Sequence, residues 1–435
     1  MTKATSERPG GDARLTRPAY TIVYTRTDVG RRASLANMPR APSVPDLGPA
    51  ILVLSPAVAP PRGGIAAATE NVVRGLEKVG DVSLLAVSQE PVTIDRRKVF
   101  ASGGTPLRRL VSRAKFATVA AATVVRARPD IVHAVTWRAA VPVALLPKRL
   151  RPTLIVHAHG TELVRSPVLA PLRNLVFRRA DGIIAVSRYT AGAVHALTGR
   201  AATVVPPSAN PPANGSVAAT EKEDGAVRIL SVGSLVARKG HINLLRAVND
   251  ARARGANCTL TIAGARGPEE GAISRLALDL DASSWLTVEV NVSAGRLAQL
   301  YGEADVFALM TRDGPREFEG FGIVFAEAGL AGLPIVAGRS GGTEDAVEDG
   351  HGAYLVLTEY EAAVTLTNLC ANPELRRRMG SEGRRHAERF LPAVVDERLA
   401  RLYSALIDNT RSHRALPTPN ARFRRSGGSR RSVGR

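Results

Sequence analysis

Short apolar segments alternate with longer amphipathic segments along the first half of the chain. Apolar runs typical of strands lie at residues 51–54, 82–87, 131–133, 154–158 and 182–186. Helix-like segments separate them, for example at residues 65–79 and, with many basic positions, at 107–126. Short apolar strands that alternate with helices predict a parallel sheet covered by helices on both faces.

A second alternation of the same kind follows a segment rich in Pro, Asn and Gly at residues 205–225. Strands are expected there at residues 228–232, 259–263, 286–290, 306–309, 335–337 and 353–356, with helices near 242–254 and 272–281. Two successive α/β halves of similar size predict two doubly wound, Rossmann-like domains that face a cleft. In such sheets ligands bind at the carboxyl ends of the strands.

These patterns divide the chain into six segments. We expect an N-terminal domain over residues 48–209, a linker over 210–225 and a C-terminal domain over 226–390. A terminal helix at residues 391–410 should pack back toward the first domain. Residues 1–47 and 411–435 lack sustained periodicity and are expected to be disordered basic extensions, apart from a short strand at 20–24. Met38 is an alternative start to Met1.

The chain offers no apolar segment typical of a membrane span or a secretory leader. Its longest apolar run, residues 116–125, covers about half of a bilayer, and residues 1–47 contain no apolar leader core. Two cysteines, Cys258 and Cys370, exclude a disulfide scaffold and a cysteine-based zinc site, and we expect both to pack in the core. These features predict a cytoplasmic protein.

Charge is distributed unevenly between the two halves. The net charge is +20, with +4 on residues 1–47, +14 on 48–215, −6 on 216–410 and +8 on 411–435. A basic half should face an anionic partner. Its basic residues form three clusters: Arg108, Arg109, Arg113 and Lys115; Lys148, Arg149 and Arg151; Arg173, Arg178 and Arg179.

An ordinary solvated face explains any single cluster of this kind. Three clusters in one domain favour an anionic membrane surface, to which each basic residue contributes on the order of 1 kcal/mol. Nucleic acid is the competing polyanion. Only 4% of the residues are aromatic, and no stacking motif is present, so nucleic-acid binding is disfavoured.

The strongest candidate for chemistry is the segment REFEGFGIVFAEAGLAGLP at residues 316–334. Glu319 and Glu327 are eight residues apart, and Gly320 and Gly322 form a loop that a ligand can approach closely. A helix expected over residues 323–330 would offer its first N–H groups to a phosphate. Carboxylates can accept hydrogen bonds from sugar or ribose hydroxyls, and both acids lie in apolar sequence, where a carboxylate needs partners.

This segment resembles the Glu-x7-Glu signature of retaining glycosyltransferases of family 4, which have the GT-B fold. Further segments occur in the order that the resemblance implies: PRGGI, PDIVHAVTW, HAHGTE, VSRYTAGAV, VVPPS, SVGSLVARKGHINLLRAV, LTIAG, AQLYGEADVFAL and GLPIVAGRSGGTEDAVEDGHGAYLV. The resemblance covers roughly residues 50–408. It implies an acceptor-side first domain and a second domain that binds a nucleotide sugar.

The resemblance also implies roles for individual residues. Glu327 would hold the donor ribose, whereas Glu319 and the backbone around it would hold the donor sugar. Lys239 and Arg238 would bind the diphosphate, whose negative charge grows as the glycosidic bond breaks. His159 would lie beside the sugar. The catalytic candidates are therefore His159, Lys239 and Glu319, and the donor-binding candidates are Gly63, Gly64, Arg238, Lys239, Glu319, Gly320, Phe321, Gly322, Ile323 and Glu327.

The sequence departs from the family pattern at two places. Ser234 occupies a position where the family commonly has Arg, and a neutral hydroxyl cannot replace a guanidinium. After Gly341 and Gly342 the family often has Pro-Glu, whereas this chain has Thr343, Glu344 and Asp345, and the sequence leaves open which acid takes the expected place.

The histidines allow several readings. His157 and His159 are two residues apart on a predicted strand, and we expect them to face opposite sides, with His159 in the cleft and His157 in the core. His133 is read as a polar residue at a strand end that contacts the acceptor only in the less favoured alternative. No His, Asp and Glu residues have the spacing of a metal site, and no metal or cofactor is expected besides the nucleotide sugar.

We therefore expect a retaining hexosyltransferase that moves a sugar from a nucleoside-diphosphate sugar to an acceptor hydroxyl. The acceptor would be a lipid-linked glycan or a polysaccharide precursor, and the enzyme would be cytoplasmic, either free or peripheral at the inner membrane face. Two alternatives stay open: a GT-B sugar-nucleotide epimerase, and a non-catalytic protein that binds sugar nucleotides or nucleic acid. The donor base, the sugar, the acceptor and the oligomeric state are not determined by the sequence.

Overall fold

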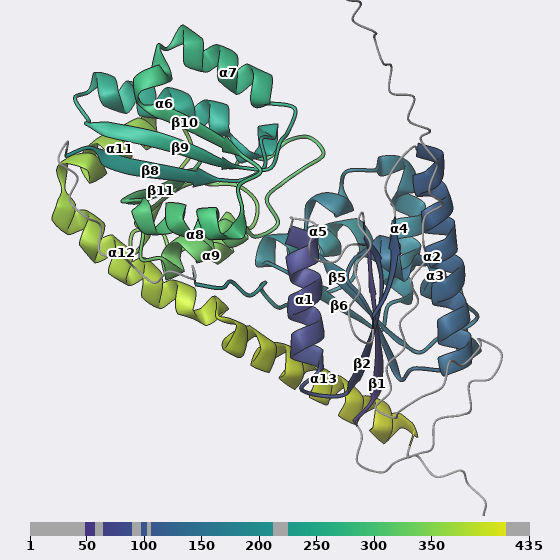
Figure 1. The fold of residues 1–435 in the computed structure, drawn as a ribbon. Coiled ribbons are helices and arrows are strands. Elements are labelled where there is room, and N and C mark those ends of the chain that lie inside the picture. Colours follow the sequence, from purple (N-terminus) through teal and green to yellow (C-terminus); the bar gives the residue numbers. More distant parts are fainter. Residues whose placement is uncertain (1–47, 57–63, 89–96, 102–105, 212–224, 415–435) are drawn as a thin grey trace, which may run out of the picture.

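The computed structural model describes residues 48–56, 64–88, 97–101, 106–211 and 225–414. The expectations for residues 1–47, Gly63, 212–224 and 415–435 lie outside this described part. The described chain forms two parallel sheets, each with helices on both faces, and the two halves lie side by side in Figure 1. The α/β architecture with two Rossmann-like domains, predicted from the sequence, is confirmed.

The first sheet has seven parallel strands in the order β3-β2-β1-β4-β5-β6-β7. The strands are β1 (Ala50–Ser55), β2 (Asp81–Ser88), β3 (Arg97–Ala101), β4 (Ile131–Ala134), β5 (Thr153–Ala158), β6 (Gly182–Ala185) and β7 (Thr203–Val204). The helices are α1 (Gly64–Leu76), α2 (Pro106–Ala127), α3 (Trp137–Ala144), α4 (Ala170–Arg179) and α5 (Arg188–Thr198). Strand β3, which is short and begins with two basic residues, was not predicted.

The second sheet has six parallel strands in the order β10-β9-β8-β11-β12-β13. They are β8 (Val227–Val232), β9 (Cys258–Gly264), β10 (Leu286–Val290), β11 (Val306–Leu309), β12 (Ile335–Gly338) and β13 (Ala353–Val356). The helices are α6 (His241–Ala253), α7 (Glu270–Asp279), α8 (Ala294–Glu303), α9 (Ile323–Leu330), the single-turn α10 (Thr343–Ala346), α11 (Glu359–Ala371) and α12 (Pro373–Ala387). In each sheet the strand order runs outward in one direction from the first strand and then continues on its other side, so it reverses between β1 and β4 and between β8 and β11. Loops at these reversal points lie on the edge that faces the other domain.

Local chemistry explains why several helices begin where they do. Ser187 caps α5 by accepting a hydrogen bond from Thr190 N at 3.0 Å, and Thr358 caps α11 by accepting one from Glu361 N at 3.1 Å. Asn372 caps α12 directly before Pro373, which is favoured at the first helical position. Each cap pairs a backbone donor that the helix itself leaves unsatisfied.

The last helix, α13 (Pro392–Arg414), crosses from the second domain to the first (Figure 1). Val395, Leu399 and Tyr403 are buried in one cluster with residues of α1 and the first sheet. Asp396 is bound by the guanidinium of Arg74 from α1, with an N–O distance of 2.8 Å. The expectation of disorder from residue 411 was wrong for its first four residues, because the helix continues to Arg414.

The residues directly before the expected linker, which spans 210–225, are packed. Residues 205–211 have no helix or strand, yet Val205, Ser208 and Ala209 are buried. Asn71 donates a hydrogen bond to the carbonyl of Ser208 at 3.1 Å, which ties this connection to α1. In the described part of the chain, no helix is both long enough and apolar enough to cross a membrane.

Candidate active site

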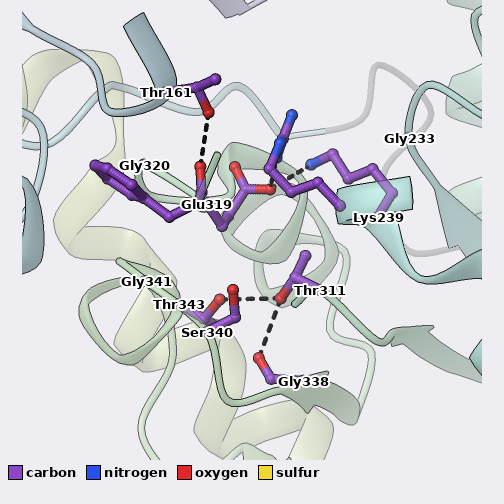
Figure 2. A network of polar contacts seen from close by, with 12 residues as sticks. Thr161, Gly233, Lys239, Thr311, Glu319, Gly320, Gly338, Ser340, Gly341 and Thr343 are labelled. Atoms are coloured by element: carbon purple, nitrogen blue, oxygen red, sulfur yellow. Dashed lines mark hydrogen bonds and ion pairs between the residues drawn. The ribbon is translucent and has the colours of Figure 1, made fainter. Parts of the chain in front are cut away.

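Glu319 binds two cations at the carboxyl edge of the second sheet (Figure 2). The Nζ of Lys239 lies 2.8 Å from its Oε2, and the guanidinium of Arg238 donates to the same oxygen. Glu319 is 7% exposed and Lys239 is 9% exposed. Burial alone would raise the pKa of Glu319, but Lys239 and Arg238 together outweigh it and hold that pKa below its ordinary value. Two cations share one carboxylate, so this cluster carries a net positive charge.

The position of Lys239 depends on two glycines. Lys239 ends a short 3-10 turn, Ala237–Lys239, and the next residue, Gly240, has φ +64°. A Cβ on Gly240 would lie 1.8 Å from the carbonyl oxygen of Met310, so only glycine fits there. The stem of Lys239 crosses Gly233, whose added Cβ would lie 3.2 Å from the lysine carbons. The sequence VGSLVARKG therefore folds so that the ammonium group reaches Glu319.

His241 lies near this turn and was not singled out in the sequence. Its ring nitrogens lie 3.3 Å from the hydroxyl of Ser231 and 3.3 Å from the carbonyl oxygen of Gly233. Burial, and next the charge of Lys239, lower the pKa of His241 to about 4. The ring is therefore neutral near pH 7, and it supports the Gly233 backbone without adding charge.

Glu327, one helical turn into α9, is the second acid of the motif. The hydroxyl of Tyr301, from α8, donates to its Oε2 at 3.0 Å. Burial raises the pKa of Glu327 to about 7, and the hydrogen bond from Tyr301 and the charge of Lys239 only partly oppose this. Tyr301 was missed in the sequence, because its pairing with Glu327 joins residues that are 26 positions apart.

The backbone around Gly320 forms the contact between the two domains. An added Cβ on Gly320 would lie 1.7 Å from the carbonyl oxygen of His159, and one on Gly160 would lie 2.8 Å from Gly320 Cα. The hydroxyl of Thr161 donates to the carbonyl of Phe318 at 2.8 Å, and that of Thr190 donates to the carbonyl of Gly320 at 3.2 Å. Both threonines lie in family-like segments, HAHGTE and VSRYT, but neither was singled out as a site residue.

Loops of the second domain hold this segment from the other side. Thr311 donates to the carbonyl of Gly338 at 3.1 Å and lies 3.2 Å from the hydroxyl of Thr343 (Figure 2). The amide of Gly342 donates to the carbonyl of Glu319 at 2.7 Å. A Cβ on Gly341 would lie 2.2 Å from that same carbonyl oxygen, which requires glycine at this position.

The two acids after Gly342 both bind arginines outside the Lys239 cluster. Glu344 pairs with Arg339 at 2.6 Å. Asp345 accepts from the backbone N of Arg188 at 3.0 Å and from its side-chain Nε at 2.6 Å, across the domain boundary. Of the two acids that the sequence left open, Asp345 therefore forms a contact between the domains, whereas Glu344 pairs within the second domain.

The expectation that His157 and His159 face opposite sides was wrong. Their rings stack with centroids 4.5 Å apart, because residues i and i+2 of a strand share a face. His133 joins the stack edge-on to His157 at 5.6 Å, and its Nδ1 is hydrogen-bonded to the hydroxyl of Tyr403. His159 Nε2 lies 2.8 Å from the carbonyl oxygen of Val135, so it is the protonated nitrogen and Nδ1 is the acceptor.

Burial keeps all three rings neutral. Burial, and next His159, lower the pKa of His133 to about 3 and that of His157 well below its ordinary value. Burial also lowers the pKa of His159, against the opposing effects of Glu162 and Val135. His157, expected in the core, is buried, and among the described residues neither of its ring nitrogens has a hydrogen-bond partner.

The remaining predicted residues differ in how close they lie to this cluster. Gly322 has φ +84° and precedes α9, which begins at Ile323. The ring of Phe321 points into the second domain and packs edge-on against Phe390, so only its backbone can contact a ligand. Gly64 begins α1 and is exposed, with open space around it. Arg238, four residues after Ser234, supplies the guanidinium that binds Glu319.

Two family models match the chain. "Glycosyltransferase Family 4" matches residues 62–211, and "Glycosyl transferases group 1" matches residues 216–386. A GDP-mannose-dependent alpha-(1-6)-phosphatidylinositol monomannoside mannosyltransferase of Mycolicibacterium smegmatis is 32% identical over 277 residues, which cover 59% of this chain and 72% of that protein. Its counterpart in Mycobacterium tuberculosis is 31% identical over 236 residues, covering 50% of this chain and 60% of that protein.

Solved structures show the same fold at low sequence identity. A sucrose-phosphate synthase from Thermosynechococcus elongatus aligns with a TM-score of 0.69 and 18% identity, covering 83% of this chain and 100% of the other. Anabaena Alr3699/HepE in complex with UDP-glucose aligns with a TM-score of 0.63 and 20% identity, covering 82% and 99%. These likenesses establish the fold and carry no further argument about substrate.

Proposed function

This chain belongs to glycosyltransferase family 4, and from that premise we propose that it transfers a mannosyl unit from GDP-mannose to a lipid glycan that contains phosphoinositol. It is a glycosyltransferase that uses a nucleotide sugar. The proposal for the donor and the acceptor is supported by the mycobacterial relatives, whose names specify GDP-mannose and phosphatidylinositol monomannoside. A D-inositol 3-phosphate glycosyltransferase of Nocardia farcinica, 29% identical over 306 residues, supports an inositol-containing acceptor.

One observation carries the proposal: Glu319 holds Lys239 and Arg238 at the carboxyl edge of the second sheet. A nucleoside diphosphate leaving group gains negative charge as its bond to the sugar breaks, and fixed cations stabilise that charge. In the structure the cations are already positioned, so little reorganisation accompanies the reaction. Glu327 lies one turn into α9, and we propose that its carboxyl accepts hydrogen bonds from the donor ribose.

Retention of the anomeric configuration follows from a same-face attack in this proposal. The acceptor oxygen forms a bond to the anomeric carbon, the bond from that carbon to the diphosphate oxygen breaks, and the acceptor proton passes to the leaving diphosphate. Glu319 is a poor nucleophile because two cations bind it. His159 uses Nε2 for the carbonyl of Val135, which leaves Nδ1 to accept a hydrogen bond from a sugar hydroxyl. We propose that no metal or other cofactor takes part.

We further propose that the enzyme works at an anionic membrane surface. The first half of the chain, residues 48–215, carries a net charge of +14, and the names of the mycobacterial relatives specify a phosphatidylinositol monomannoside as acceptor. Anionic headgroups attract basic residues within about a Debye length of the surface. This arrangement would present the acceptor edge of the first domain to the bilayer.

A donor panel read by thermal shift and by product analysis tests the proposal. We expect GDP-mannose to stabilise the protein more than UDP-glucose does. At pH 8, above the Glu327 pKa of about 7, we expect Glu327→Ala to raise the Kd for GDP-mannose by roughly tenfold to a hundredfold, since hydrogen bonds to a charged group contribute about 1.5–3 kcal/mol. Glu374→Ala, an exposed acid on α12, is the matched control. Stabilisation by UDP-sugars alone would contradict the donor assignment. Conversion of the donor sugar without an acceptor would favour an epimerase instead.

A further inference from the structure

Three arginines from three different elements gather at the acceptor edge of the first domain. Arg138 lies in the first turn of α3, Arg165 follows the 3-10 turn Thr161–Leu163, and Arg113 lies on α2. All three side chains are exposed. Arg138 donates to the hydroxyl of Ser166 at 2.9 Å, which fixes the start of α3 to the loop that carries Arg165.

The charges of the three groups act on one another. Burial lowers the pKa of Arg138, Glu162 raises it, and the charges of Arg113 and Arg165 lower it further. Glu162 is the one acid among these neighbours, and its Oε1 already accepts the amide of His159 at 2.6 Å. Three cations therefore face one partly engaged carboxylate, which leaves an excess of positive charge open to solvent.

This cluster lies close to the expected position of the sugar. Gly320 touches His159, and the side chain of Glu162 binds the amide of His159. The carbonyl of Glu162 accepts from Trp137 Nε1 at 3.0 Å, and the guanidinium of Arg138 lies 4.6 Å from the Trp137 ring centre. Short contacts therefore link the donor loop of the second domain to Arg138. An acceptor that reaches the sugar would pass these arginines.

An exposed apolar side chain lies in the loop segment that carries Arg165. Val168, three residues after Arg165, is 90% exposed. Cations beside apolar side chains suit a phosphate at the boundary between water and lipid.

We propose that Arg113, Arg138 and Arg165 form the subsite that binds the phosphate of the acceptor. The inference rests on the proposed function and deepens it by naming the residues that select a phosphorylated acceptor. Guanidinium groups bind phosphate through paired hydrogen bonds, and three of them around one anion compensate its charge. The same subsite takes the phosphodiester of a membrane lipid or a free inositol phosphate.

Charge-neutral variants of the full chain test the subsite. Arg138→Gln combined with Arg165→Gln is compared with Arg126→Gln combined with Arg178→Gln, which removes the same two charges from the last turns of α2 and α4. With GDP present, we expect the double variant to raise the Kd for inositol 1-phosphate about tenfold or more, and Arg113→Gln to raise it in the same direction. The control, the melting temperature and the Kd for GDP should stay unchanged.

Vesicles separate the two sources of phosphate. Phosphatidylcholine vesicles with a minor fraction of phosphatidylinositol are compared with vesicles that carry phosphatidylglycerol instead. A loss for inositol 1-phosphate and for phosphatidylinositol vesicles alike supports an inositol-phosphate subsite that also takes the lipid, whereas a loss for inositol 1-phosphate alone supports a soluble phosphorylated acceptor. An equal loss on phosphatidylglycerol vesicles, or a double variant that binds inositol 1-phosphate as tightly as wild type, would overturn the subsite. A wild-type protein that binds no guanine nucleotide would overturn the proposed function instead.

Discussion

Lys239 is held by a carboxylate before any substrate binds. Its ammonium group pairs with Glu319, and its stem lies against Gly233 in a buried position. The entropy of ordering a long side chain is therefore spent during folding rather than during binding. A cation fixed in this way stabilises charge that develops late in the reaction, which separates its role in turnover from its role in affinity.

Lys239→Ala should lower turnover at least as much as it weakens donor binding. The diphosphate carries more charge in the transition state than in the ground state, so loss of the cation affects kcat more than Kd. We expect kcat to fall by roughly a hundredfold or more, in line with the removal of a preorganised electrostatic group. Single-turnover kinetics with saturating GDP-mannose measure this. Unchanged turnover per bound donor would remove Lys239 from the diphosphate site.

Glu327 makes stability depend on pH in a defined window. Burial raises the pKa of its carboxyl from 4.5 to about 7, so between these values the folded state binds a proton more tightly than the unfolded chain does. The stabilising effect of this proton is therefore fully present below about pH 4.5 and is lost as the pH rises through 7. The melting temperature of Glu327→Gln minus that of wild type should therefore increase as the pH rises from 5 to 8. A difference between the two proteins that does not change with pH would contradict the raised pKa.

At the scale of elements, the start of α5 docks the first domain onto loops of the second. Arg188 pairs with Asp345, and the hydroxyl of Tyr189 donates to Asp313 at 3.4 Å. Asp313 also accepts from Ser340 at 2.7 Å, so the acidic stretch before Glu319 takes part in the same boundary. The arginine side chain is 76% exposed, and a pair of this kind contributes only about 0.2–1 kcal/mol.

Arg188→Glu should weaken the contact between the domains and shift the molecule toward a more open arrangement, without unfolding either domain. Repulsion from Asp345 replaces attraction, so we expect a larger radius of gyration in small-angle X-ray scattering and a change in melting temperature of only a few degrees. The swap Arg188→Glu with Asp345→Arg should restore the compact form. Arg178→Glu, an exposed arginine on α4, controls for the change of net charge. An unaltered radius in the single variant would show that this pair does not hold the domains together.

Helix α13 packs against the first domain and contacts the histidine stack there. The hydroxyl of its Tyr403 binds His133, and both side chains are fully buried. Tyr403→Phe would leave Nδ1 of His133 without its partner, and an unsatisfied buried group of this kind costs about 1–3 kcal/mol. We expect a lower melting temperature, by several degrees, for the first domain. Tyr360→Phe on α11, where the ring is 63% exposed, should be neutral, and an equal effect of both variants would contradict the account.

At the scale of the whole molecule, charge separates the two halves of the enzyme. Residues 48–215 carry +14 and residues 216–410 carry −6. In the first half, Arg113, Arg138 and Arg165 are exposed. In the second half, many acids pair with arginines of the same domain, as Glu289 does with Arg296. The molecule therefore has an electrostatic direction that would orient it on an anionic surface.

Binding to anionic vesicles should release at high salt. The Debye length falls from about 10 Å at 0.1 M to about 3 Å at 1 M, which screens an electrostatic attachment. Removal of residues 415–435, with six arginines, should weaken flotation, and reversal of Arg108, Arg109 and Arg113 to Glu should cut transfer to membrane acceptors more than to a soluble analogue. Equal flotation with neutral and anionic vesicles would make a soluble acceptor the better hypothesis.

The pattern of apolar and polar residues is enough to predict the order of strands and helices and the motif at α9. The helix predicted at 323–330 and the strands predicted at 286–290, 306–309 and 353–356 match the structure, because periodicity over a few residues depends on which face each side chain buries. The acids of the motif were found because carboxylates in apolar sequence need partners. Short β3, whose pattern is weak, was beyond this reasoning.

The hydrogen-bond partners of the site residues depend on the fold of the whole chain. Tyr301 with Glu327, Thr190 with Gly320 and Asp345 with Arg188 join positions 26 to 157 residues apart. Such pairs depend on how strands are ordered in each sheet and how the two domains meet, which local periodicity does not encode. The expectation that His157 and His159 face opposite sides misapplied the strand period. Residues two positions apart on a strand share a face, so the sequence alone already predicts that both rings lie together. Tyr403, by contrast, reaches His133 from 270 residues away, and only the path of α13 across the domains brings it there.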